Sequence, residues 1–86
     1  MELICYVESV EAERTFKGRD GREVKAKEVI LVDGLNRYAA TAFDRTAEKE
    51  FEVTHYYKVS LSFDIRKTTD GKIFQSIIMN NAAKLW

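Results

Sequence analysis

Hydrophobic and polar residues alternate in short runs along most of this chain, and a period of two is typical of half-buried β-strands. The clearest run covers residues 58–65, where four apolar side chains from Val59 to Ile65 alternate with polar ones. The same pattern predicts a long first strand over about residues 2–16 and a last strand over residues 73–79.

Two further strands are predicted in the middle of the chain. Within residues 24–32 the alternation gives way to the apolar run Val29-Ile30-Leu31-Val32, which predicts a register change or bulge near Glu28. Residues 36–43 form the next expected strand. Three Asp-Gly pairs separate the strands, and each predicts a two-residue type I′ turn with positive φ at both positions. These pairs are Asp20-Gly21, Asp33-Gly34 and Asp70-Gly71.

One segment breaks the β pattern and predicts a short helix. Residues 45–52 are polar and rich in helix formers, with Ala47 and Phe51 spaced to share one helix face. Asp44 stands before them as the expected N-cap. The predicted order is therefore a three-stranded meander, a helix and a hairpin.

That order predicts an all-β protein with the OB-fold, a five-stranded partly open barrel with a short helix between strands 3 and 4. A small SH3-like barrel is the alternative, although it usually lacks a helix at this place. A length of 86 residues and a mass of 10.0 kDa fit a single OB-fold domain over residues 1–86.

Charge is balanced overall but unevenly placed. The chain has 14 basic and 14 acidic residues, yet residues 14–27 hold six basic against two acidic ones. Residues 66–72 hold three basic residues against Asp70. Both basic segments surround predicted hairpin turns, where cations are available to a partner.

Composition also bears on location and chemistry. The chain has one cysteine, Cys5, and it shows neither a signal-peptide pattern nor an apolar span of about 20 residues. These features favour a cytoplasmic location. His55 is the one histidine, and no nucleophile motif or glycine-rich phosphate loop accompanies it. The chain is therefore not expected to be an enzyme, and no cofactor or metal is expected.

The segment Ala40-Thr41-Ala42-Phe43-Asp44-Arg45-Thr46-Ala47-Glu48 resembles part of the bacterial single-stranded DNA-binding protein family. In that family the third strand ends in an apolar-Ala-Phe-Gly run, followed by a basic residue and an Ala-Glu pair. Asp44 replaces the usual glycine, and Arg37 stands where a stacking tryptophan is frequent. The chain ends at Trp86 without the family's acidic C-terminal tail, so a primosomal, plasmid or phage-type relative fits better than the full replication protein.

The resemblance implies non-catalytic binding of single-stranded nucleic acid, DNA more than RNA, in replication, recombination or repair. Bases would stack on aromatic rings while cations follow the phosphates. Strand 36–43 is expected to turn Tyr38, Ala40 and Ala42 to the core and Phe43 outward. The expected nucleic-acid-binding residues are Phe16, Lys17, Arg19, Arg22, Lys25, Lys27, Arg37, Phe43, Lys67, Lys72 and Phe74.

One alternative function and one structural role for the other aromatic residues stay open beside this interpretation. The barrel could instead be an oligomeric adaptor for protein–protein interaction, without nucleic-acid binding, whose basic hairpins meet an acidic partner.

The remaining aromatic residues are expected in the core, because a small barrel needs large side chains inside. They are Tyr6, Phe51, Tyr38, Tyr56, Tyr57 and Phe63.

The first strand also carries a prediction about assembly. Leu3, Cys5 and Val7 lie on one face, with Ile4 and Tyr6 on the other, so an exposed edge here would invite pairing with another chain. A homodimer or homotetramer is expected, as the resemblance also implies. The alternative is that residues 82–86 fold back over this strand within one chain.

Overall fold

The computed structural model describes residues 1–85 as six strands and one short helix, with every strand in one sheet. The elements are β1 (Glu2–Val10), β2 (Arg14–Lys17), β3 (Glu23–Asp33), β4 (Asn36–Phe43), α1 (Arg45–Glu48), β5 (Tyr56–Lys67) and β6 (Ile73–Lys84). Trp86, the last residue of the predicted cover over the first strand, lies outside the described residues.

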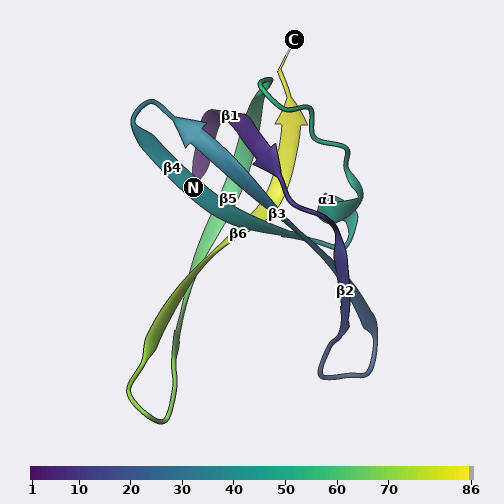
Figure 1. The fold of residues 1–86 in the computed structure, drawn as a ribbon, viewed down its shortest axis with the longest axis vertical. Helices are drawn as coiled ribbons and strands as arrows, with labels where there is room; N and C mark the ends of the chain where they lie inside the picture. The colour runs from purple at the N-terminus through teal and green to yellow at the C-terminus, as the bar shows by residue number, and fades with distance from the viewer. Residues whose placement is uncertain (86) are drawn as a thin grey trace.

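The sheet closes on itself into a barrel (Figure 1). Its strand order is β1-β5-β6-β4-β3-β2, and the additional pairing of β1 with β3 completes a ring of β1, β5, β6, β4 and β3. The β4–β6 pair is parallel and the other pairs are antiparallel. A five-stranded ring with a helix after its third long strand confirms the predicted OB-fold and excludes the SH3-like alternative.

The predicted first strand is interrupted, and this interruption corrects the predicted bulge. Residues 11–13 separate β1 from β2, and these three residues face only residues 27 and 28 of β3. A second register shift lies between Val7 and Ser9. β3 itself runs past Glu28 in unbroken register with β4. The extra residue is therefore in the neighbouring strand, where it lets one strand bend around the barrel.

The long hairpins turn at the predicted places but not with the predicted turn type. Gly21 and Gly71 have positive φ values of 80° and 90°, whereas Asp20 and Asp70 do not. In each hairpin the glycine N–H donates to the residue three positions earlier, at 3.0 Å. This is a three-residue loop with glycine in the left-handed position, so type I′ is wrong here. The Asp33-Gly34 turn likewise has positive φ only at glycine.

The helix is shorter than predicted, and its expected cap is absent. α1 ends at Glu48, so Phe51 lies in the extended segment that leads to β5. Asp44 makes no side-chain capping bond; its carboxylate accepts from the Lys25 N–H at 3.4 Å. Its φ of 49° and ψ of −116° lie in a region that favours glycine, the residue usual in the resembled family.

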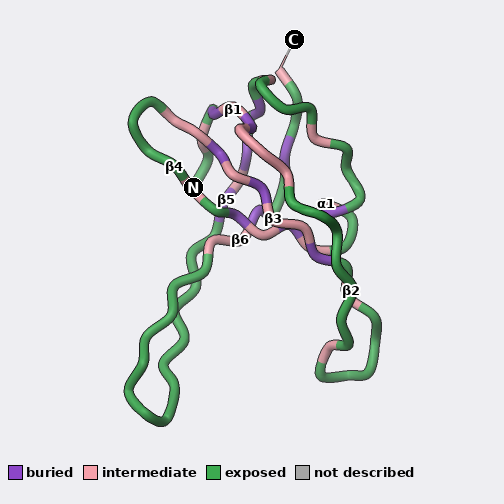
Figure 2. Tube along the Cα trace, viewed as in Figure 1, coloured by how far each residue is buried: buried purple, intermediate pink, exposed green. Residues whose placement is uncertain are grey.

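The core fills the barrel and stops where the two long hairpins leave it (Figure 2). Its largest fully buried side chains are Leu31, Leu61, Met79, Val7, Val29, Val59 and Cys5. Ala40, Ala42 and Ala47 are also fully buried, and these small residues let α1 approach the strands closely. Burial, with a smaller contribution from Asp33, raises the pKa of the Cys5 thiol to about 11.

The aromatic residues predicted for the core divide into three groups. Tyr57 is buried, and Tyr6, Tyr38 and Phe51 are partly buried. Tyr56 and Phe63 are each 47% exposed, so their predicted burial is wrong. Tyr56 lies on the outer barrel wall beside Tyr6, with ring centroids 5.9 Å apart. Phe63 lies opposite Ile77, the first residue of β6 that pairs with β4, and so stands at the end of the closed ring.

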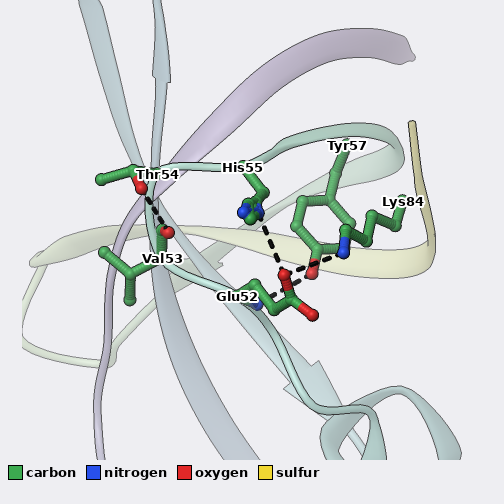
Figure 3. A network of polar contacts seen from close by, with 6 residues as sticks. All are labelled: Glu52, Val53, Thr54, His55, Tyr57 and Lys84. Carbon is green, nitrogen blue, oxygen red and sulfur yellow. Dashed lines mark hydrogen bonds and ion pairs between the residues drawn. The ribbon is translucent and has the colours of Figure 1, made fainter. Parts of the chain in front are cut away.

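A network of polar contacts fixes the segment between α1 and β5 (Figure 3). The Glu52 carboxylate accepts from Lys84 at 2.8 Å and lies 3.0 Å from Nδ1 of His55. The Glu52 N–H donates to the Tyr57 hydroxyl at 2.8 Å. The Lys84 contact, and more weakly the charge of His55, lowers the pKa of the Glu52 carboxyl. The network ties this segment to the end of β6.

The premise of the assembly prediction is wrong in part. β1 is hydrogen-bonded to β5 along residues 2–6 and to β3 along residues 6–10. It therefore joins the ring on both sides, although within residues 1–85 each half of β1 pairs with one strand only. For residues 82–85 the alternative cover over β1 is wrong as well, because they continue along β5 as far as the bond from the Leu85 N–H to the Tyr56 carbonyl. Homo-oligomerisation itself stays a prediction.

Candidate nucleic-acid interface

Two hairpins extend from the barrel as exposed arms (Figure 1, Figure 2). The first arm is β2 with the first half of β3, and the second is the outer half of β5 with the start of β6. In an OB-fold, the ligand surface lies across the strands between the corresponding loops. Here β4 crosses between the two arms.

An aromatic pair marks one part of this surface. The rings of Phe16 and Phe43 meet edge to face, with centroids 6.4 Å apart. Phe43 is directly opposite Ala26 on β3, and Phe16 is directly opposite Val24 two residues away, so both rings are on one strand face. A cavity of about 360 Å³ opens here between the arms. Its lining is Arg14, Phe16, Glu28, Thr41, Phe43, Asp64, Arg66, Ser76 and Ile78.

A second, larger cavity opens where β6 leaves β4. The two strands pair only from Ala40 to Ala42 of β4, and before that point they diverge. The cavity has a volume of about 570 Å³. Its lining is Glu28, Arg37, Tyr38, Ala39, Thr41, Phe63, Gln75, Ser76 and Ile77, so Tyr38 and Phe63 supply its aromatic surface.

Glu28, Thr41 and Ser76 line both cavities, which therefore form one continuous surface, here called the groove. Aromatic residues lie toward each end of the groove and polar residues lie between them. The predicted faces of strand 36–43 are confirmed: Ala40 and Ala42 are fully buried, Tyr38 packs on the core and Phe43 lies in the groove.

Each arginine that lines the groove has a carboxylate partner. Arg14 bonds Glu28 at 3.0 Å, Arg66 lies 4.0 Å from Asp64, and Arg37 bonds Glu8 at the rim. The Arg37–Glu8 contact raises the pKa of the guanidinium, which is charged in any case. These exposed pairs are weak in water, so a phosphate can replace the carboxylate at low cost.

Of the predicted site residues, Phe16, Arg37 and Phe43 line the groove. Phe74 is opposite Arg66 on the second arm, on the strand face that carries Ser76 and Ile78, and is 53% exposed. It therefore extends the groove face outward along that arm.

Five predicted cations lie toward the outer ends of the arms. Arg19 and Arg22 belong to the first turn and Lys72 to the second, while Lys17 and Lys67 end β2 and β5. Within residues 1–85 none of the five forms an ion pair. Lys17 and Lys67 are on the strand faces opposite Phe16 and Phe74. Among the described residues, these cations on the arms thus have no ion-pair partner, whereas each arginine in the groove is paired with a carboxylate.

Lys25 and Lys27, which were predicted to bind nucleic acid, lie on the opposite face of β3 from the residue that pairs with Phe43. Lys27 is opposite the buried Ala42, on the core side of β3. Its ammonium donates to the Lys49 carbonyl at 3.2 Å, and Lys25 bonds Glu48 at 3.3 Å. Both lysines therefore bond to residues on the α1 side of the barrel. Because β3 keeps its register with β4, both lysines stay on the strand face of Val29, whereas the bulge predicted near Glu28 would have moved them to the other face.

Several groove residues were missed from the sequence. Arg14 and Arg66 lay within the two basic segments, and their strand positions could have indicated them: Arg14 alternates with Phe16, and Arg66 faces Phe74. Phe63 was assigned to the core. Nothing in the sequence indicated that Glu28 would lie at the middle of the groove.

Outside the groove, the described residues form a further cavity but hold no metal-ligand cluster and no membrane-spanning helix. A cavity of about 500 Å³ beside Lys49, Glu52 and the end of β6 shares no residue with the groove. Residues 1–85 contain no cluster of three histidine, cysteine or acidic side chains placed to hold a metal ion. No helix in that range is long and apolar enough to cross a membrane.

The groove and the barrel topology place this chain in the OB-fold class. It is similar to the solution structure of the second OB-fold domain of replication protein A from Methanococcus maripaludis, with a TM-score of 0.78 and 18% identity. The match covers 98% of this chain and 81% of that domain. No family model and no curated protein matches the sequence. The likeness shows a shared fold; the predicted bacterial family is not established by it.

Proposed function

We propose that residues 1–86 act as one OB-fold domain that binds single-stranded nucleic acid, DNA in particular, without catalysing a reaction on it. The observation that carries the proposal is the groove itself, open between two arms, with aromatic pairs toward both ends. Exposed aromatic faces stack on any base, and each engaged base contributes about 1–3 kcal/mol.

The charges support the same reading. Arg14, Arg37 and Arg66 line the groove, and cations without ion-pair partners in residues 1–85 lie farther out on both arms. A strand could run with its phosphates at the rim and its bases on the floor. The likeness to a replication protein A domain supports a role in replication, recombination or repair.

A protein-interaction adaptor is the second candidate, and the observation in its favour is apolar exposure on the second arm. Ile65 and Ile73 are 67% and 68% exposed and share one strand face. This surface is turned away from the Phe74 face, and it continues the strand face of Phe63 and Gln75, which line the larger cavity of the groove. We propose it only as an alternative to the groove function.

Titration of labelled oligo-dT at low and moderate salt tests the proposal. We expect binding that weakens steeply as salt rises, because bound phosphates release counterions. The same strand annealed into a duplex is the control and should bind more weakly, because its bases cannot stack on the groove. Absence of binding to the single strand at tens of micromolar protein in both salts would leave the adaptor as the better interpretation. Oligo-U of equal length tests the preference for DNA.

A further inference from the structure

A single carboxylate lies at the middle of the groove. Glu28 lines both cavities and is directly opposite Thr41 of β4. On the same face of β3, Ala26 lies two residues away and carries Phe43 opposite it, a separation of about 7 Å along the strand. The Glu28 side chain is 41% exposed. A base stacked on Phe43 therefore presents its edge toward this carboxylate.

The carboxylate keeps hydrogen-bonding capacity for a ligand. Its Oε1 accepts from Arg14 at 3.0 Å, and within residues 1–85 no other side chain bonds to it. An ionised carboxylate has about four acceptor positions and no donor. It repels phosphate, so the groove floor at this point is suited to a base edge rather than to the backbone.

Nucleobases differ in what they offer to such an acceptor. Guanine presents two adjacent donors, N1–H and the exocyclic amino group, which match the two oxygens of a carboxylate. Adenine and cytosine present one amino group. Thymine and uracil present a single N–H between two carbonyl oxygens, and both carbonyls are repelled by the carboxylate.

We propose that Glu28 sets the base preference of the groove, favouring bases with exocyclic amino groups, guanine first, over thymine. This rests on the proposed function. Stacking on Phe16 and Phe43 supplies sequence-independent affinity, and the Glu28 carboxylate discriminates among the bases held there. Arg14 positions the carboxylate through their ion pair.

The test compares three labelled oligonucleotides of equal length: thymine only, thymine alternating with guanine, and thymine alternating with hypoxanthine. Isolated guanines prevent four-stranded structures. Hypoxanthine keeps N1–H but lacks the amino group. Wild-type protein should bind the guanine strand at least about fivefold more tightly than the thymine strand, the lower range of a two-bond base contact. The hypoxanthine strand should fall between them.

The variant Glu28→Gln separates the effect of Glu28 on base preference from the effect of its negative charge on overall affinity. It removes a negative charge and releases Arg14, so it should bind the thymine strand more tightly than wild type, whereas the guanine strand also loses its bonds to the carboxylate. The ratio between guanine and thymine strands, however, should fall close to one. Asp64→Asn is the matched control, since Asp64 is the other groove carboxylate with an arginine partner. It should strengthen binding to every strand and leave the ratio unchanged.

The outcomes are distinct. Equal binding of all three strands by wild type overturns the role of Glu28 and leaves the proposed function standing. A preference that survives in Glu28→Gln overturns it too, because another group must then read the base. Failure to bind any of the strands overturns the proposed function and this inference together.

Discussion

The barrel and the arms contain the same kinds of residue in opposite environments. In the barrel, Leu31 and Leu61 are at most 1% exposed. On the second arm, Ile65 and Ile73 are 67% and 68% exposed, although Ile65 belongs to the same alternating run as Leu61. Burial of apolar area stabilises a fold, so the arm side chains contribute little to stability and are available to a ligand.

Neighbouring strands cause the difference. Leu61 lies where β5 and β6 belong to the closed ring, opposite the buried Met79. Beyond Phe63 the two strands pair only with each other, and Figure 2 shows that no other element covers them. A two-stranded ribbon cannot bury either face. The molecule therefore separates stability in the barrel from binding on the arms and groove.

The largest expected effect tests this separation directly. Leu31→Ala should lower the free energy of unfolding by about 2–5 kcal/mol, because it leaves a cavity in a filled core. Ile73→Ala, on the arm, should change it by no more than about 0.5 kcal/mol. Urea unfolding followed by circular dichroism measures both. Comparable losses in the two variants would show that the arm packs on something in solution.

The second prediction concerns the groove. Phe43→Ala should weaken oligo-dT binding by about 1–3 kcal/mol, the stacking contribution of one base. Tyr56→Ala is the control, because Tyr56 is an aromatic residue on the outer barrel wall that is more exposed than Phe43. Fluorescence anisotropy compares the two. If Tyr56→Ala weakens binding and Phe43→Ala does not, the ligand lies on the other side of the barrel.

The junction between β4 and α1 gives the third prediction. Asp44 has a φ of 49°, so Asp44→Gly should relieve backbone strain of about 1–3 kcal/mol. Part of that gain is offset by the lost contact from the Lys25 N–H. A net rise of roughly 1 kcal/mol in unfolding free energy is expected. A destabilised variant would mean that the Asp44 carboxylate matters more than the strain.

The fourth prediction sharpens the assignment of cations. Arg37→Ala should reduce the slope of log affinity against log salt by roughly one unit, because one phosphate contact is lost. Lys25→Ala should leave the slope unchanged, since Lys25 bonds Glu48 on the α1 side. Binding titrations at several salt concentrations provide the slopes. The reverse result would place the nucleic acid along α1.

The smallest effect is on acid stability of the barrel. The pKa of the Glu52 carboxyl is lower in the folded state than in the unfolded chain, chiefly because Lys84 bonds it. Its contribution is therefore present above the unfolded pKa and lost as the pH falls through the folded pKa. Glu52→Gln should flatten the fall in stability with acid, whereas Glu50→Gln should not. Thermal unfolding across acidic pH values measures this.

The sequence predicted the fold well where local signals and packing agree. The strand over residues 36–43 was predicted with its observed limits, and its faces were right, because Ala40 and Ala42 alternate without interruption. The turns fell at the Asp-Gly pairs because glycine supplies the positive φ. The length of the helix was overestimated, because the composition of residues 45–52 favours a helix whereas the chain must turn back toward β5 after Glu48.

Among site residues, the aromatics Phe16 and Phe43 were predicted and brought together, but their contact depends on register. Residues 11–13 supply the extra residue that sets how β2 pairs with β3. No pattern in the sequence fixes which strand of a pair carries an extra residue. For this reason the sequence did not show that Lys25 and Lys27 face the α1 side of the barrel, and Glu28 was overlooked.

The sequence alone determined the elements: alternation set the strands, glycines set the turns, and small residues set where α1 can approach. These depend on local sterics and on the period of burial, which neighbouring residues define. Tertiary structure decided which apolar side chains are buried, which arginines have partners, and that Glu28 lies at the centre of the groove. Those outcomes depend on strands distant in sequence meeting in one register, and hydrophobic alternation is the same for a strand inside the barrel as for one that extends beyond it.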